Sequence, residues 1–111
     1  MQMSPEYFLA TTAHLESKGF ARQTIEDPAE MLGGCVVGVM RQVLERGDRK
    51  LIFDLVRDQG GGVRYFLELD WSGASTFSLQ LDTWKHWPDR LEVKFVATPD
   101  TGLALSIRLR W

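Results

Sequence analysis

Residues 63–71, VRYFLELDW, place an apolar or aromatic side chain at every second position. These alternate positions are Val63, Tyr65, Leu67, Leu69 and Trp71. The intervening positions carry the charged residues Arg64, Glu68 and Asp70. A period of two is typical of a β-strand with one buried and one exposed face. We therefore expect this segment to be a strand of an antiparallel sheet.

The same alternation recurs on both sides of this strand, over residues 51–58, 77–82, 91–97 and 103–111. Turn-forming sequences separate the segments: QGGG at 59–62, SGAS at 72–75 and TPDTG at 98–102. The pattern predicts an antiparallel meander with one buried face. Besides the alternate residues of 63–71, this face is expected to contain Leu51, Phe53, Leu55, Phe77, Leu79, Leu81, Leu91, Val93, Phe95, Ala97, Leu103, Leu105, Ile107, Leu109 and Trp111.

Residues 4–19, SPEYFLATTAHLESKG, predict a helix. Ser4 can cap the first turn, Pro5 suits the first helical position, and Gly19 can end the helix in a left-handed conformation. We expect the packing stripe to consist of Phe8, Leu9, Thr12 and Leu15. His14 lies near this stripe and is interpreted as a partly exposed helix residue.

Residues 20–30 begin as a short strand that Pro28 interrupts. Residues 31–46, MLGGCVVGVMRQVLER, fit two interpretations. Asp27, Pro28 and Glu30 could cap a helix here. However, each interior glycine costs a helix about 1 kcal/mol, and valine favours strands. We favour a strand from about 35 to 45, followed by a tight turn in ERGDRK, and keep a second helix as the alternative.

The dimensions of these elements suggest how they pack. Five strands spaced about 4.8 Å apart span roughly 20 Å, whereas a helix is only about 10 Å wide. One helix cannot cover a flat sheet of this width. We expect a single α+β domain over residues 1–111, with the N-terminal helix on a strongly curved antiparallel meander of six or seven strands. The alternative is two helices on a five-stranded antiparallel sheet.

Composition excludes several classes of function. The formal net charge is −2 and the chain has no basic stripe, so we expect no nucleic-acid partner. No apolar run approaches the roughly 18 residues of a membrane helix, and the N-terminus does not resemble a signal peptide. The single cysteine, Cys35, lies in an apolar run and is interpreted as a core residue. We expect a cytoplasmic protein of bacterial type.

The chain carries no motif that demands catalysis or a cofactor. His14, Cys35 and His86 lack the spacing of metal ligands, and the glycine-rich stretches match neither a P-loop nor a dinucleotide fingerprint. Glu68 and Asp70 would share the wet face of a strand. We therefore predict no catalytic residue, metal or cofactor.

Residues 81–93, LDTWKHWPDRLEV, form the segment with the most distinctive chemistry. The candidate binding residues are Trp84, Lys85, His86, Trp87 and Arg90. A single helical turn would show both indoles on one side, and exposed Trp and Arg are typical of binding hot spots. Alternatively, Trp84 and Trp87 plug the open end of the curved sheet. We favour the plug and keep the recognition surface as the second interpretation.

The sequence supports three classes of function. We favour a non-catalytic module that docks on another protein, as immunity proteins, inhibitors and secretion chaperones do. A carrier that holds an apolar molecule in the cup of the sheet is an alternative, although the many large apolar residues predict a filled cup. An enzyme using Asp82, His86 and Arg90 is the third. An apolar C-terminal edge strand ending at Trp111 would also favour a homodimer.

Overall fold

The computed structural model describes residues 3–27, 36–97 and 105–111. One helix precedes seven strands: α1 (Pro5–Ser17), β1 (Ala21–Asp27), β2 (Val36–Arg46), β3 (Arg49–Asp58), β4 (Val63–Trp71), β5 (Ala74–Trp87), β6 (Arg90–Phe95) and β7 (Ser106–Arg110). The fold is therefore α+β with an N-terminal helix, as predicted. No helix in the described ranges has the length and apolar content that crossing a bilayer requires.

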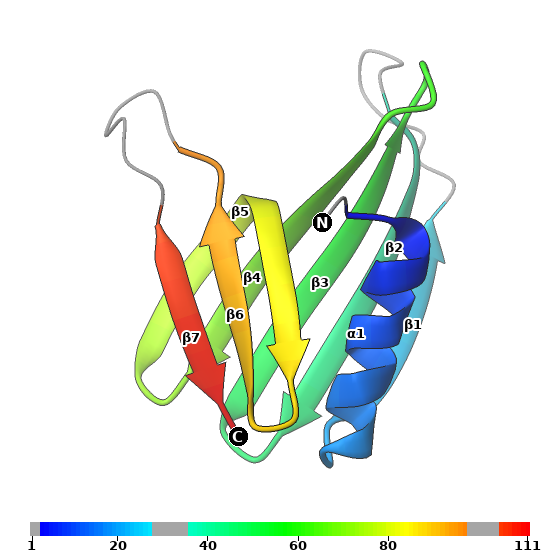
Figure 1. Ribbon diagram of the computed structural model, residues 1–111. Helices are drawn as coiled ribbons and strands as arrows, with labels where there is room; N and C mark the ends of the chain where they lie inside the picture. The colour runs from blue at the N-terminus through cyan, green and yellow to red at the C-terminus, as the bar shows by residue number, and fades with distance from the viewer. Residues whose placement is uncertain (1–2, 28–35, 98–104) are drawn as a thin grey trace.

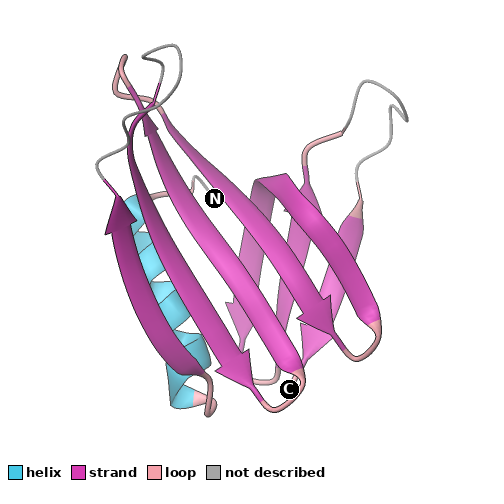
Figure 2. Cartoon of the chain, turned by 180° about the vertical axis from the view of Figure 1, so that it is seen from behind, coloured by secondary structure: helices cyan, strands magenta, loops and turns pink. Residues whose placement is uncertain are grey.

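All seven strands belong to one antiparallel sheet in the order of the sequence, β1 to β7. The sheet is open, with β1 and β7 as its outermost strands. Strand β5 changes partner along its length: it pairs with β4 from Ala74 to Leu81 and with β6 from Leu81 to Trp87. Figures 1 and 2 show α1 on the same side of β3 and β4 as β6 and β7.

Helix α1 has the ends that the sequence predicts. The Ser4 side chain accepts a hydrogen bond from the Tyr7 N–H at 3.1 Å, and Pro5 occupies the first turn. Gly19 follows the helix with φ of 93°. The buried residues of α1 are Phe8, Thr11, Thr12 and Leu15. Leu9 is 43% exposed, so its place in the predicted stripe is wrong, because Thr11 is the residue that continues the Phe8 face at i+3.

The ambiguous segment forms a strand over its described part. Residues Val36–Arg46 are β2, so the second helix is wrong for this stretch. Strand β2 pairs with β3 through a turn at Gly47 and Asp48, with Arg46 opposite Arg49. Residues 28–35, including Pro28 and Cys35, lie outside the described residues.

Alternate residues of the sheet form the core with α1. Its buried apolar members are Phe8, Leu15, Phe20, Leu44, Leu51, Phe53, Leu55, Tyr65, Leu67, Leu69, Trp71, Leu81, Trp84, Leu91, Val93, Phe95 and Leu109. The predicted alternation is confirmed over β4 and β6. In β3 the predicted core residues Leu51, Phe53 and Leu55 are buried, but Asp54 on the opposite face is buried too, where it pairs with Arg41. Ala97 and Leu105 are exposed, which corrects their assignment to the lining, and Leu103 lies outside the described residues.

Phe77 is the clearest departure from the predicted pattern. It is 89% exposed, although the sequence places it in the core. Leu67 pairs with Leu79 and Leu69 pairs with Thr76, so two residues of β5, Phe77 and Ser78, lie opposite Glu68 alone. Such a β-bulge inserts one extra residue and shifts the alternation of the strand.

The two ends of the sheet meet through aromatic side chains. Phe20 precedes β1 and Trp111 follows β7, and their ring centroids are 6.3 Å apart. Phe20 also stacks on Trp71 at 5.5 Å. The Trp111 indole donates a hydrogen bond to the Pro88 carbonyl at 3.0 Å. Trp111 is therefore packed against its own chain instead of lining an apolar free edge.

Candidate functional site

The candidate binding residues lie on a β-hairpin. Strand β5 continues to Trp87, Pro88 and Asp89 form the turn, and Arg90 begins β6 opposite Trp87. The interpretation of this segment as a helical turn is therefore wrong. Residues three apart on a strand face opposite sides of a sheet. The structure accordingly separates Trp84 and His86, on the inner side with α1, from Lys85 and Trp87.

Trp84 occupies the core beneath the hairpin. Its side chain is 3% exposed, and its ring packs edge-on against Tyr65 at 4.9 Å and Phe53 at 5.0 Å. The indole N–H donates to Thr11 Oγ1 at 2.9 Å. For Trp84 this arrangement supports the structural plug that the sequence favours.

His86 joins the hairpin to α1 through Thr11. The Thr11 hydroxyl donates to the Tyr7 carbonyl at 2.8 Å and lies 2.9 Å from His86 Nδ1. A hydroxyl has one proton, so a hydroxyl proton committed to Tyr7 leaves His86 Nδ1 as the donor to Thr11. The imidazole is thus held in a defined orientation against the helix.

The two histidines of the chain stack on each other. Their ring centroids are 4.8 Å apart, and His14 Nε2 lies 2.9 Å from the Trp87 carbonyl, which can only accept a hydrogen bond. Tyr7 also stacks on His86, with their ring centroids 5.2 Å apart. Burial lowers the pKa of His86, and the nearby His14 lowers it further. His86 therefore favours its neutral form in this cluster.

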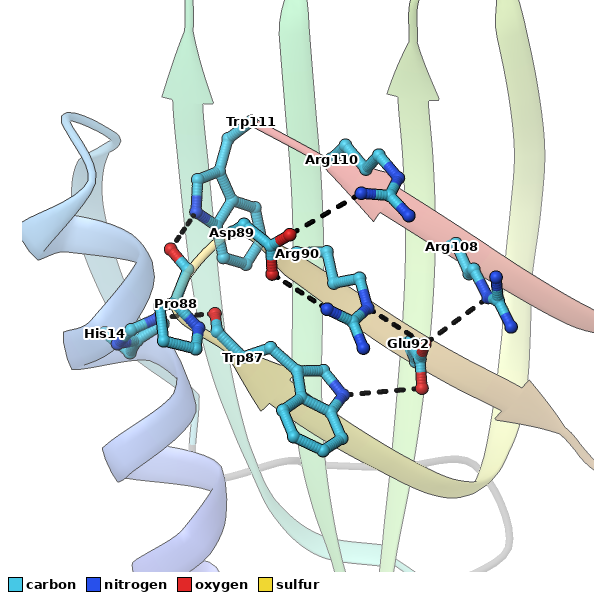
Figure 3. A network of polar contacts seen from close by, with 9 residues as sticks. All are labelled: His14, Trp87, Pro88, Asp89, Arg90, Glu92, Arg108, Arg110 and Trp111. Atoms are coloured by element: carbon cyan, nitrogen blue, oxygen red, sulfur yellow. Dashed lines mark hydrogen bonds and ion pairs between the residues drawn. The ribbon is translucent and has the colours of Figure 1, made fainter.

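Trp87 lies on the opposite side of the sheet, between two cationic side chains. Lys85 Nζ is 4.0 Å from the ring centroid and Arg90 Cζ is 4.7 Å from it. The indole N–H donates to Glu92 Oε2 at 3.4 Å (Figure 3). Trp87 remains partly exposed, so it does not act as a plug.

A chain of ion pairs extends from Trp87 across β6 and β7. Asp89 contacts Arg90 at 2.9 Å and Arg110 at 3.5 Å, and Glu92 contacts Arg90 at 3.0 Å and Arg108 at 3.3 Å (Figure 3). The hydrogen bond from Arg90 lowers the pKa of Glu92. Most of these groups are exposed, so the pairs orient the side chains but contribute little stability individually.

We call this outer surface of β5–β7 the basic face, and it consists of Lys85, Trp87, Arg90, Glu92, Lys94, Arg108 and Arg110, with Asp89 at the turn. Cross-strand pairing puts these residues on one side, because Lys85 is opposite Glu92 and Glu92 is opposite Arg108. Five cations face two carboxylates here, whereas the whole chain has a net charge of −2. Among the described residues, Lys85 and Lys94 form no ion pair.

Sequence reasoning found only part of this site. It named Trp87, Lys85 and Arg90, but not Lys94, Arg108 and Arg110, which strand pairing brings beside them. The alternating arginines of LALSIRLRW were the available signal, although nothing in the sequence says which strand they neighbour. Thr11 and His14 were also missed as partners of the hairpin.

The structure does not assemble the three residues of the enzyme alternative. His86 faces α1 and Arg90 faces outward, while Asp82 is exposed on β5. No hydrogen bond or ion pair joins these three within the described ranges. Over the same ranges, no group of three or more His, Cys, Asp and Glu residues is placed to hold a metal ion.

Comparison with known proteins gives no relative: no family model, no curated protein and no solved structure matches the chain.

Proposed function

We propose that this protein is a non-catalytic binding module that docks its basic face on an acidic surface of another protein, in the manner of an immunity protein, inhibitor or chaperone. The observation that carries the proposal is the position of Trp87, which is partly exposed and flanked by Lys85 and Arg90. Trp and Arg are the residue types that dominate binding hot spots.

Charge supports a partner with acidic side chains. Lys85 and Lys94 have no carboxylate partner among the described residues, so each can pair with an Asp or Glu of the other protein. Positive patches of this kind also steer an acidic partner during its approach. Glu92 and Asp89 interrupt the face and would repel a continuous phosphate backbone, which favours a protein over a nucleic acid.

A fluorescein-labelled peptide of alternating Asp, Glu and Leu residues tests this proposal by fluorescence anisotropy. We expect saturable binding that weakens at least about tenfold when Lys85→Glu is combined with Arg108→Glu. The control pair Lys50→Glu and Arg57→Glu makes the same change in net charge at exposed positions of β3 and should leave binding within about twofold. Equal losses in the two pairs, or tighter binding of a labelled DNA duplex, would contradict the proposal.

The two tryptophans separate binding from stability. Trp87→Ala should weaken peptide binding at least about tenfold and leave the fold intact, because Trp87 lies outside the core. Trp84→Ala should instead lower the free energy of unfolding by about 3–5 kcal/mol, because it opens a cavity and removes the partner of Thr11. Urea titration followed by circular dichroism measures the free energy of unfolding of both variants, and fluorescence anisotropy measures their peptide binding. An unfolded Trp87→Ala variant would count against a docking role.

We also infer that the sheet is strongly curved. Adjacent strands lie about 4.8 Å apart, so β1 and β7 of a flat seven-stranded sheet would be separated by roughly 29 Å. The 6.3 Å between the Phe20 and Trp111 rings supports a sheet that turns around α1. A cytoplasmic location is a further proposal, and the single cysteine of the chain supports it.

The homodimer stays a prediction. Strand β7 is outermost in the sheet and carries Arg108 and Arg110 on its outer side. Symmetric pairing of two β7 strands centred on Arg108 would oppose identical charges, which is destabilising. The geometry therefore favours a different protein as the partner of this side of the molecule.

A further inference from the structure

Phe77 lies almost entirely in solvent on the outer side of the sheet. It is 89% exposed, and the β-bulge places it with Ser78 opposite Glu68. Bulges are over-represented next to functional sites, where they redirect a side chain. Aromatic residues are enriched in protein interfaces, because their burial removes a large apolar area from water. These features make Phe77 a candidate anchor residue for a partner.

The neighbouring strands also carry apolar residues on this outer side. In β3, the run LIFDLV at 51–56 sends alternate residues into the core and keeps Ile52 and Val56 on the outer side. Strands that are covered on both sides are apolar on both sides, whereas a strand with one wet side alternates. Helix α1 covers the inner side of β1–β4, and Figure 2 views these strands from the outer side, where no described helix or strand covers them.

We call this surface the Phe77 face, and it consists of Val43, Glu45, Lys50, Ile52, Glu68, Asp70 and Phe77. Strand pairing sets these residues on one side, because Glu45 is opposite Lys50, Lys50 is opposite Asp70, and Ile52 is opposite Glu68. A hollow of about 430 Å³ lies within the face, and its lining includes Ile52, Glu68 and Phe77.

Charge indicates which partner this face fits. Glu45, Glu68 and Asp70 form no ion pair with any residue that the structure describes, and Lys50 is the only cation of the set. Arg41 lies beside the face on β2, but it is neutralised by Asp54 through two hydrogen bonds of 2.9 Å. The face therefore combines an apolar centre with unpaired carboxylates, and a cationic partner with an apolar side chain complements both.

We propose that the Phe77 face docks a protein segment that carries Lys or Arg beside a large apolar side chain. The apolar side chain of the segment packs on Phe77 and Ile52, while Glu68 and Asp70 pair with its cationic groups. The Phe77 face shares no residue with the basic face and takes a partner of the opposite charge. The inference therefore goes beyond the docking function proposed above and does not require it.

A fluorescein-labelled peptide of alternating Lys and Leu residues tests the inference by fluorescence anisotropy. We expect saturable binding to the native protein, and Phe77→Ala should weaken it at least about tenfold. The urea midpoint of Phe77→Ala should not change, because the side chain lies outside the core. Glu68→Gln combined with Asp70→Asn should weaken binding roughly threefold to tenfold, since it removes both carboxylates without changing side-chain size.

Matched variants separate the Phe77 face from general effects of charge and hydrophobicity. Leu9→Ala shortens an exposed apolar side chain of α1, on the other side of the sheet, and should bind the peptide normally. Glu26→Gln combined with Asp82→Asn makes the same change in net charge at other exposed positions and should leave binding within about twofold. Equal losses in the two carboxylate pairs, or native affinity in Phe77→Ala, would overturn the inference, as would a native protein that does not bind the peptide.

Two further measurements identify the occupant of the face. Trp87→Ala should keep its affinity for the Lys-Leu peptide and Phe77→Ala its affinity for the acidic peptide, so failure of one docking surface is distinguished from failure of the other. In analytical ultracentrifugation, the native protein and Phe77→Ala should sediment alike. Self-association that Phe77→Ala abolishes would instead place a second copy of the chain on the face and contradict a separate cationic partner.

Discussion

At the scale of single residues, Thr11 links the helix to the hairpin. Its hydroxyl contacts Tyr7, Trp84 and His86 within 2.9 Å, and the side chain is fully buried. The Trp84 indole N–H is buried and has Thr11 Oγ1 as its acceptor, so it would be unsatisfied without that hydroxyl. The orientation of both Trp84 and His86 therefore depends on a small polar residue that the sequence does not distinguish from its neighbours.

Stability should fall in mild acid through His86. Its pKa is lowered in the folded protein relative to the ordinary value of 6.5. The unfolded chain therefore takes up a proton at higher pH than the folded chain does. The stabilising effect is complete above about pH 6.5 and is lost as the pH falls from there toward the folded pKa.

Urea unfolding at several pH values between about 7.5 and 5.5 measures this effect. His86→Asn keeps a side-chain N–H that can donate to Thr11 but cannot titrate, so its free energy of unfolding should fall less steeply with acid. Carboxylates present in both proteins contribute equally to the two curves, so their effect cancels when the free energies of unfolding are subtracted. Parallel curves for the native protein and the variant would rule out His86 as a source of the pH dependence.

At the scale of elements, the register of β5 decides which side chains are buried. The bulge at Phe77 and Ser78 and a second register shift between Leu81 and Thr83 interrupt its alternation. The first places Phe77 in solvent, and the second precedes the stretch that points Trp84 inward. Bulges arise from pairing between strands, so they leave no mark in the apolar pattern of one strand.

The turn between β4 and β5 offers a test at this scale. Ser72 and Gly73 connect Trp71 to Ala74 with φ values of 50° and 83°. Positive φ at both central residues is the geometry of a type I′ turn, which prefers Asn followed by Gly. Ser72→Asn should therefore raise the free energy of unfolding by about 0.5 kcal/mol.

Chemical denaturation compares this variant with Ser75→Asn, which introduces the same residue within β5. That control should be neutral or destabilising, because Asn is disfavoured in strands. A stabilising Ser75→Asn, or a Ser72→Asn that unfolds earlier than the native protein, would show that the turn geometry is not responsible.

At the scale of the whole molecule, the aromatic contact between Phe20 and Trp111 links the two ends of the chain. Phe20 is buried and also receives the guanidinium of Arg46 over its ring at 5.4 Å. Trp111 is half-buried and lies 5.9 Å from the His14 ring. These contacts bring the first and last strands of the sheet to one shared cluster.

A double-mutant cycle on Phe20→Leu and Trp111→Leu tests the curvature that this cluster supports. Rings in contact should give a coupling free energy of about 0.5–1.5 kcal/mol in urea unfolding. In a flat sheet the two residues would lie roughly 29 Å apart and their effects would add. Additive effects within error would therefore contradict a curved sheet. As a control, Phe20→Leu is combined with Leu105→Ala, and the effects of this pair on the free energy of unfolding should add.

The sequence by itself determined the element types and much of the core. Alternation in VRYFLELDW and LIFDLVRD predicted two strands, and Ser4, Pro5 and Gly19 predicted the helix ends, because these signals depend on neighbours a few residues away. It also identified the hairpin residues Trp84 to Arg90 as chemically distinctive. Only the tertiary structure decided that Trp84 is core while Trp87 is surface, since facing depends on register and bulges. Likewise, only the tertiary structure stacks His14 on His86 and places Arg108 on the same face as Lys85. Contacts between distant segments follow from the packing of the whole chain.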